Sequence, residues 1–299
     1  MEELNAYPYI PTLAFLAGVE HQGDAMLPVL QELAAAGADV FAVEESTGMS
    51  ALHGAVFAGA RETMQWLEQQ GLSRTALDKL GRTLSMIAAM GGQLEMLKEL
   101  TPASADLLVQ DVMGQGLHLY AAQGGSLPCL EYLEERGLDV TVPGAKNGGS
   151  PLIAAAYSGS IPCVEFFLNK GIDIHVSFKD GVNALMYAAW GGQPEMLSYL
   201  MSKGMKADYL DKEGNSALHH AAFGGHVEVL KMLCEAGLDV NLANGSTKMT
   251  PLMISARRGY VSAVEYLLSQ GADKNARDIN GLTAADYAHL IDILTLLEQ

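Results

Sequence analysis

NALMYAAWGGQPEML, residues 183–197, decides the fold of this chain: two glycines and a glutamine separate two short apolar segments. Two glycines before an amide side chain suit a flexible catalytic loop, a turn that binds an anion, or a hinge between two helices. A single copy would leave all three alternatives open, so the number and spacing of the copies decide between them.

The stretch recurs along the chain with a nearly constant period. Close copies are AAMGGQLEML (88–97), AAQGGSLPCL (121–130) and AAFGGHVEVL (221–230), and looser ones lie at 54–64, 154–164 and 254–264. The second glycine of each copy follows the one before it by 33 or 34 residues, at positions 59, 92, 125, 159, 192, 225 and 259. A catalytic loop is needed once, whereas a hinge is needed in every unit, so the period indicates a repeat protein.

One unit, residues 211–241, shows the local structure that we expect in each repeat. Its opening Asp-x-x-Gly is a tight-turn signal, and Ser216 stands where a helix N-cap is wanted. ALHHAA then has the apolar spacing of a short helix, which Gly224 and Gly225 end through a left-handed residue. HVEVLKMLCEAG is a second amphipathic helix, and LDVN leads in extended form to the next turn. Each repeat is therefore predicted to be a finger-like turn followed by two antiparallel helices.

Neither helix of such a unit is stable alone, because isolated helices shorter than about 12–15 residues are marginal in water. Stacked repeats bury each other's apolar faces, and this explains why one unit is copied so many times. The sequence therefore predicts an all-α solenoid.

The copies resemble a known family. SALHGAV (50–56), SPLIAAA (150–156), NALMYAA (183–189), SALHHAA (216–222) and TPLMISA (250–256) resemble the Thr-Pro-Leu-His-x-Ala-Ala core of ankyrin repeats, and AGADV, RGLDV, AGLDVN and QGADKNA resemble its closing Gly-Ala-Asp-Val-Asn. The resemblance covers nearly the whole chain. It implies an ankyrin-repeat α-solenoid with hairpin-like fingers.

We expect a single domain over residues 1–299, with about nine repeats whose first and last members act as caps. The approximate boundaries are 9–43, 44–77, 78–110, 111–143, 144–177, 178–210, 211–243, 244–277 and 278–299. Two repeats depart from the pattern. The third lacks the closing Gly-Ala-Asp segment, and in the fourth Leu117 and His118 are displaced by one position, so we expect a local irregularity there.

Composition limits the classes of partner and the compartment. The 299 residues carry a formal net charge of −17, and such an anionic surface repels phosphate backbones and anionic lipid. No stretch approaches the roughly 20 apolar residues of a membrane span, and the acidic start MEELNAYPYI is unlike a secretory signal. We expect no nucleic-acid or membrane partner and a cytoplasmic location, with secretion by a specialised system left open. The negative charge favours a basic partner or serves solubility alone.

No set of residues suggests a catalytic, cofactor-binding or metal-binding site. The resemblance gives His53 and His219 the position where a polar ring braces the turn, which is a structural role. The spacing of His, Cys, Ser and Asp fits neither a metal site nor a nucleophile–base pair, and the glycine pairs do not follow a strand as in a dinucleotide site. We therefore predict no catalytic residue, no cofactor and no metal, and a protein that is not an enzyme.

One register of the repeat carries the candidate binding residues. The residue after the second Ala of each x-Ala-Ala is predicted to end the first helix on the concave side, towards the fingers. Its bulky or charged members are Phe57, Tyr157, Trp190, Phe223 and Arg257. Because the next residue is small in most repeats, the rings would stay uncovered and anchor a partner. The alternative is that each ring packs against the adjacent repeat and seals the stack.

Apolar residues close to the predicted turn tips extend this surface. They are Met49, Met113, Val182 and Met249. Exposed apolar tips have little structural use, and methionine suits an adaptable contact surface.

These observations predict a non-enzymatic protein-binding module that uses its concave face and finger tips. The partner would be a protein with a basic or mixed surface, and the chain alone a monomer. One role that fits is an inhibitor or immunity-type protein that covers a basic toxin or enzyme. The alternatives are a scaffold or a host-directed bacterial effector or adaptor, and an enzyme whose activity resides in the irregular third and fourth repeats.

Overall fold

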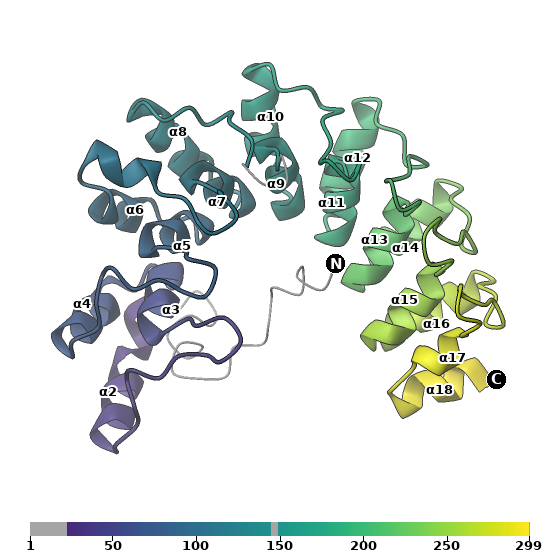
Figure 1. Ribbon diagram of the computed structural model, residues 1–299, viewed down its shortest axis with the longest axis horizontal. Helices are drawn as coiled ribbons and strands as arrows, with labels where there is room; N and C mark the ends of the chain where they lie inside the picture. Colours follow the sequence, from purple (N-terminus) through teal and green to yellow (C-terminus); the bar gives the residue numbers. More distant parts are fainter. Residues whose placement is uncertain (1–22, 145–148, 299) are drawn as a thin grey trace. The chain divides into compact units, whose positions relative to one another are not determined.

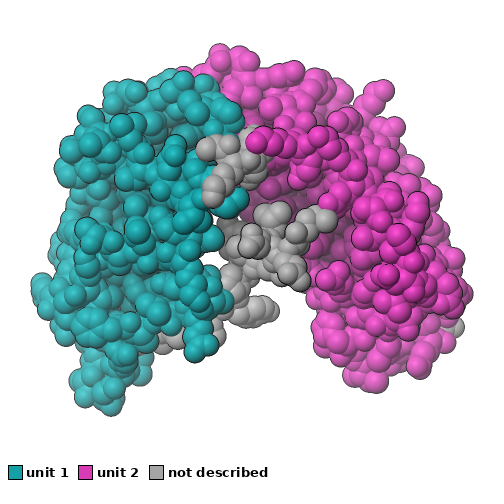
Figure 2. All heavy atoms as spheres, in the orientation of Figure 1, with its two compact units in different colours: residues 1–147 teal, residues 148–299 magenta. Residues whose placement is uncertain are grey.

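The structure is a computed structural model that describes residues 23–144 and 149–298 (Figure 1). Its contacts divide the chain into two compact units, unit 1 (Met1–Asn147) and unit 2 (Gly148–Gln299), which Figure 2 colours separately. The predicted single domain stays a prediction. The beginnings of the predicted repeats 9–43 and 144–177 lie outside the described residues.

Helices dominate both units. Unit 1 contains η2 (Gly23–Met26), α2 (Leu27–Ala35), α3 (Ala51–Ala58), α4 (Arg61–Gln69), α5 (Leu84–Met90), α6 (Leu94–Leu100), η3 (Ser104–Leu108), α7 (Leu117–Gln123) and α8 (Leu127–Glu135). Unit 2 contains α9 (Pro151–Ser158), α10 (Ile161–Asn169), α11 (Ala184–Trp190), α12 (Pro194–Ser202), α13 (Ala217–Gly224), α14 (Val227–Glu235), α15 (Pro251–Arg258), α16 (Val261–Ser269), α17 (Ala284–Tyr287) and α18 (Ile291–Glu298). β-Pairing within the described ranges is confined to isolated antiparallel bridges in fingers, such as Val43–Ser50 and Ser177–Asn183. The predicted all-α solenoid with hairpin-like fingers is confirmed.

The helices of each unit form two rows. In unit 2, α9, α11, α13, α15 and α17 pack side by side as the first row, and α12, α14, α16 and α18 form the second row together with α10, which packs on α9 (Figure 1). In unit 1, α3, α5 and α7 form the first row, backed by α4, α6 and α8. The alanines and leucines between the rows are almost fully buried, so apolar burial between neighbouring repeats holds each unit together.

The two glycines of the hinge have different structural roles. The second one takes the left-handed conformation predicted for it, with φ of +69° at Gly192 and +77° at Gly225. The first one allows neighbouring helices to approach, because a Cβ on Gly191 would lie 2.3 Å from the carbonyl oxygen of Tyr157. A Cβ on Gly224 would likewise lie 2.4 Å from the carbonyl oxygen of Trp190. The small residue therefore serves backbone packing rather than leaving the preceding ring uncovered.

Each finger turn of the Asp-x-x-Gly type is built around a buried carboxylate. In unit 2, Asp211 Oδ1 accepts hydrogen bonds from the backbone N–H of Glu213 at 2.9 Å and of Asn215 at 2.8 Å. Adjacent fingers are also joined by backbone bonds, for example from Lys212 N to Asp180 O at 2.8 Å. Within unit 2 the fingers from Phe178 to Gly281 thus form a continuous strip.

Removing the turn carboxylate should destabilise unit 2. We expect Asp211→Ala to lower the free energy of unfolding by about 1–3 kcal/mol, because two backbone N–H groups lose their acceptor. Asp211→Asn should cost less than half as much, since Asn244 fills the same role in the next finger, accepting from Met249 N at 3.2 Å. Urea unfolding at pH 7 measures both values. Equal losses in the two variants would contradict this account of the turn.

The third repeat carries the irregularity that the sequence predicts. The 3-10 helix η3 replaces the usual Gly-Ala-Asp connection after α6. The segment between α6 and η3 is held by the next repeat, because the Arg136 guanidinium donates to the carbonyl oxygens of Thr101 at 3.2 Å and Pro102 at 3.3 Å. The distortion therefore remains local.

Candidate functional site

Three rings of the predicted register contact one another in unit 2. Tyr157, Trp190 and Phe223 end α9, α11 and α13, and each side chain is half-buried. The ring centroids of Tyr157 and Trp190 lie 5.4 Å apart at an interplanar angle of 69°, and those of Trp190 and Phe223 lie 5.7 Å apart at 76°. Edge-to-face packing between adjacent repeats is therefore observed, and part of each ring still faces solvent.

Two further rings, which the sequence analysis missed, complete this cluster. Tyr187 of α11 lies 5.3 Å from Trp190 and 6.1 Å from Tyr157, and Phe178 of the preceding finger lies 5.0 Å from Tyr187, all between ring centroids. The spacing contains the signal for Tyr187, because residues three apart share a helix face. Phe178 stands where four other fingers have the turn carboxylate, at Asp78, Asp111, Asp211 and Asp278. We call Tyr157, Phe178, Tyr187, Trp190 and Phe223 the aromatic ladder.

Contacts between the first row and the fingers show which way the ladder faces. The position of Tyr187 is taken by His220 in α13 and by Tyr287 in α17, and both reach a finger turn: His220 Nε2 lies 3.3 Å from Asp211 Oδ2, and Tyr287 donates to Asp278 Oδ2 at 2.7 Å. Burial alone would raise the pKa of Asp211, but hydrogen bonds from His220 and Asn215 lower it to about 2. The ladder thus lies on the face of unit 2 that turns to the fingers, which we call the finger-side face.

Arginines lie at the α15 end of the ladder. The Arg258 guanidinium carbon is 3.7 Å from the Phe223 ring centroid, which is a cation–π contact worth about 0.5–2 kcal/mol. Arg257, in the predicted register, is exposed, and its positive charge acts on the Tyr287 hydroxyl. The finger-side face therefore ends in guanidinium groups.

The predicted exposure of three turn residues is wrong. Met49, Val182 and Met249 are only 7%, 7% and 8% exposed. Each directly precedes a helix N-cap, so it lies at the base of its finger rather than at the tip, where the next repeat covers it. Arg82 of the following repeat, for example, has its Nη2 3.6 Å from the sulfur of Met49. Leu282 has the same place in the last repeat and is 37% exposed.

The other predicted residues lie in unit 1. Phe57 at the end of α3 is 36% exposed, and its carbonyl oxygen accepts from Gln93 Nε2 at 3.1 Å. Met113 is a half-buried tip residue of the finger before α7. Their role in partner binding stays a prediction.

The three buried histidines, His53, His118 and His219, have structural partners. His53 Nδ1 accepts from Ser50 N at 3.2 Å, and His219 Nδ1 accepts from Ser216 N at 3.2 Å, as the bracing role predicts. His118 Nε2 lies 2.7 Å from the carbonyl oxygen of Val142, so this ring of the irregular fourth repeat also has a partner in the fold. Among the described residues no group of three or more His, Cys, Asp or Glu is placed to hold a metal ion.

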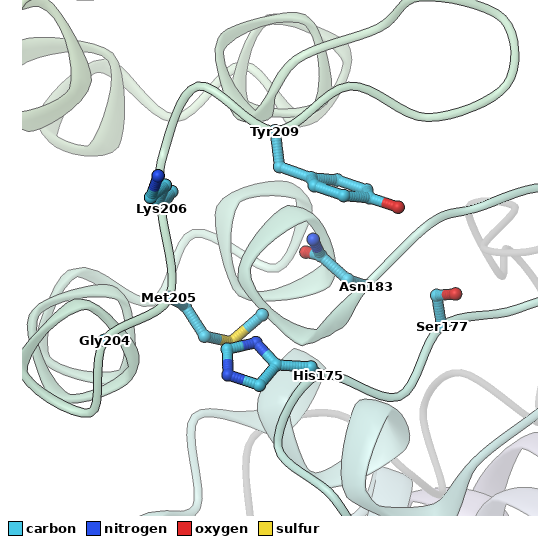
Figure 3. A pocket seen from close by; sticks show the side chains of 7 residues that line it. All are labelled: His175, Ser177, Asn183, Gly204, Met205, Lys206 and Tyr209. Atoms are coloured by element: carbon cyan, nitrogen blue, oxygen red, sulfur yellow. The ribbon is translucent and has the colours of Figure 1, made fainter.

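A small cavity of about 210 Å³ opens beside the finger that precedes α11 (Figure 3). It is lined by His175, Ser177, Asn183, Gly204, Met205, Lys206 and Tyr209. Asn183 is already used as the N-cap of α11, accepting from Met186 N at 3.1 Å. The volume lies below the roughly 300–1,000 Å³ of small-molecule sites. A second cavity of about 610 Å³ lies within that range and is lined by two connecting segments, with Met205, Asp208, Leu238 and Leu242 among its residues. The aromatic ladder is a candidate site of another kind, because it is a series of half-buried rings in contact over three repeats and not a cavity.

Stacked pairs of short helices with joined fingers define a helical repeat protein whose functional surface is spread over several repeats. The family described as "Ankyrin repeats (3 copies)" matches residues 18–111, 86–178 and 174–244, and "Ankyrin repeats (many copies)" matches residues 244–288. The chain belongs to the ankyrin repeat family. Repeats of this family generally serve in protein–protein interaction and are typically non-enzymatic.

A search of the curated proteins finds no match to this chain. In the described part of the chain, every helix is too short or too polar to span a bilayer.

Proposed function

We propose that unit 2 is a protein-docking module whose anchor is the aromatic ladder. The observation that carries this proposal is the continuous series of half-buried rings, from Phe178 in a finger to Phe223 in α13, on one face of three successive repeats. Large amphipathic rings supply much of the binding energy of protein interfaces. The rings fix one another in place, so a partner would lose little free energy in ordering them.

The biological role of this protein depends on whether docking blocks the partner's activity. An inhibitor or immunity-type protein would cover the active surface of a basic partner, and the net charge of −17 supports this because it would speed the encounter. A scaffold or a host-directed effector or adaptor would use the same face without blocking its partner. We propose inhibition as the first role to test and a monomer as the free state, and a scaffold or adaptor is the alternative.

The docking proposal is tested with peptides selected on the immobilised full chain from a phage-displayed library of random twelve-residue sequences. Trp190→Leu removes the central ring, and we expect it to weaken the selected peptides at least about tenfold, as for an interface hot spot. The matched control is Phe166→Leu in α10, because Phe166 is also half-buried and packs edge-to-face, 5.3 Å from Phe167, but lies in the second row.

The control should bind the selected peptides as the wild type does while losing similar stability. Equal binding by both variants, or a library without enriched peptides, would refute docking on the ladder.

A further inference from the structure

Charged residues are sorted between the two helix rows of unit 2. The first-row helices α9, α11, α13 and α15 contain no Asp or Glu, and α15 ends in Arg257 and Arg258. The second-row helices α10, α12, α14 and α16, with their C-cap residues, contain three lysines, Lys170, Lys203 and Lys231, and five exposed glutamates, Glu165, Glu195, Glu228, Glu235 and Glu265. The helices that carry the rings therefore have no carboxylate, whereas the helices behind them carry a net negative charge.

The fingers add positive charge to the ladder's side. Lys179, Lys212 and Lys248 are exposed on three successive fingers, and the backbone bond from Lys212 N to Asp180 O joins the first two of these fingers. Lys248 is also the one non-glycine residue with a positive φ, +61°, among the described residues. The finger that carries Phe178 thus presents a lysine directly beside the ladder.

Acidic residues on the same face are fewer and mostly occupied. Asp211 and Asp278 are buried and hold their turns through backbone N–H groups. Asp286 accepts from Thr283 N at 2.7 Å as part of a helix cap. Asp180, which is exposed, and Glu213, which is half-buried, remain. At the finger turns and on the first-row helices, exposed cations therefore outnumber exposed carboxylates, whereas the segments that lead from the second row into the fingers carry the exposed carboxylates Asp173, Asp208, Asp239 and Asp273.

The packing of the rings argues against nucleic acid as the anionic partner. Bases bind aromatic side chains by stacking on open ring faces. Four rings of the ladder meet edge to face, at 83° between Tyr187 and Trp190, and the Arg258 guanidinium covers a face of Phe223. Phe178 is tilted by 34° against Tyr187. The overall negative charge would also repel a long polyanion.

Resting on the proposed function, we propose that the finger-side face of unit 2 binds an acidic peptide segment of a partner whose surface as a whole is mixed in charge. The apolar side chains of this segment contact the ladder. Its carboxylates would pair with Lys212, Lys248 and Arg257. Alternate side chains of an extended peptide are about 6.6 Å apart, close to the 5.4 Å and 5.7 Å between successive rings at Trp190. A segment of about eight residues would span the ladder and reach the finger cations.

The test uses the same random twelve-residue library on the full chain. We expect the selected pool to be enriched in Asp and Glu together with apolar or aromatic residues. A soluble peptide from that pool should bind Lys212→Glu/Lys248→Glu at least about tenfold more weakly at low salt, because two attractive charges become repulsive. The matched control is Lys203→Glu/Lys231→Glu, which makes the same change of net charge behind the second row and should alter affinity less than twofold.

Other results would overturn the acidic-peptide proposal. A pool enriched in Lys and Arg that still depends on Trp190 would refute it while leaving docking on the ladder in place. Equal losses in the two lysine variants would show that only net charge matters. Displacement of the peptide from wild type by a twelve-nucleotide oligothymidine, but not by inorganic phosphate, would assign the face to single-stranded nucleic acid. A pool without enrichment would remove both proposals.

Discussion

Lowering the pH from 7.5 to 5 should destabilise both units by about 2 kcal/mol for each buried turn histidine. His53 in unit 1 and His219 in unit 2 are almost fully buried. Burial lowers the pKa of each from 6.5 to about 4, and the positive charge of Arg82 adds to the shift at His53 while Asp78 opposes it. These two rings should make the fold acid-sensitive well above the range in which carboxylates titrate.

The hydrogen bonds explain why the folded state resists protonation. His53 Nδ1 accepts from the Ser50 N–H, so the proton of the neutral ring lies on Nε2. A second proton would have to sit on Nδ1, facing another donor. His219 has the same arrangement with Ser216.

The sign of the effect follows from the two pKa values. Between pH 6.5 and about 4 the unfolded chain binds a proton that the folded chain does not, so acid favours the unfolded state. The stability that the neutral rings contribute is complete above pH 6.5 and is lost progressively as the pH falls to about 4. Burial lowers the pKa of His118 as well, which acts in the same direction.

The residues at the equivalent positions of other repeats suggest variants that test this pH dependence. Met86 and Met186 stand at the position of His53 and His219, so His53→Met and His219→Met should fold and should each reduce the loss between pH 7.5 and 5 by about 2 kcal/mol. Urea unfolding at several pH values, with amide exchange in α3 and α13 to separate the units, measures it. The control is His175→Met, at an exposed position. An unchanged pH slope in the buried variants would show that other groups cause the acid sensitivity.

The second large effect is expected from Gly191→Ala. The added Cβ would lie 2.3 Å from the carbonyl oxygen of Tyr157 and 3.2 Å from its ring carbon Cδ2. Backbone atoms cannot turn aside as a flexible side chain can, so α9 and α11 would have to separate. We expect a loss of about 1–3 kcal/mol in the free energy of unfolding, in spite of alanine's better helix propensity. The loss of the ladder's geometry should weaken peptide binding as well.

Ser158→Ala is the matched control for this substitution, because Ser158 follows Tyr157 as Gly191 follows Trp190 and already carries a Cβ. It removes one hydrogen bond, to Ala155 O at 2.9 Å, and should cost less than about 1 kcal/mol. Thermal and urea unfolding give both values. A Gly191→Ala protein as stable as the wild type would mean that the two helices tolerate a wider spacing.

The sequence predicted most of the local structure and one part of the site. Period, caps and hinge glycines led to the correct fold class and family because those signals act within a few residues of each other. The register of Tyr157, Trp190 and Phe223 was found for the same reason. Tyr187 was missed although it shares the helix face of Trp190, because it was not compared with its equivalents His220 and Tyr287.

The wrong predictions concern residues whose exposure is set by contacts between repeats. Met49, Val182 and Met249 were predicted to be exposed because they are apolar and near turns. Whether a residue near a turn is exposed depends on the following repeat, as the contact between Arg82 and Met49 shows. No property of the residue alone contains that information.

By itself, the sequence determined that this chain is a stack of two-helix ankyrin repeats, since a period of 33 or 34 residues, N-caps and left-handed glycines are properties of each unit. Only the tertiary structure decided that Phe178 and Tyr187 join the ring register and that the hinge glycines bring backbones together. The physical reason is that burial and ring contacts arise between repeats, where the neighbour of a residue is set by packing and not by its position in the chain.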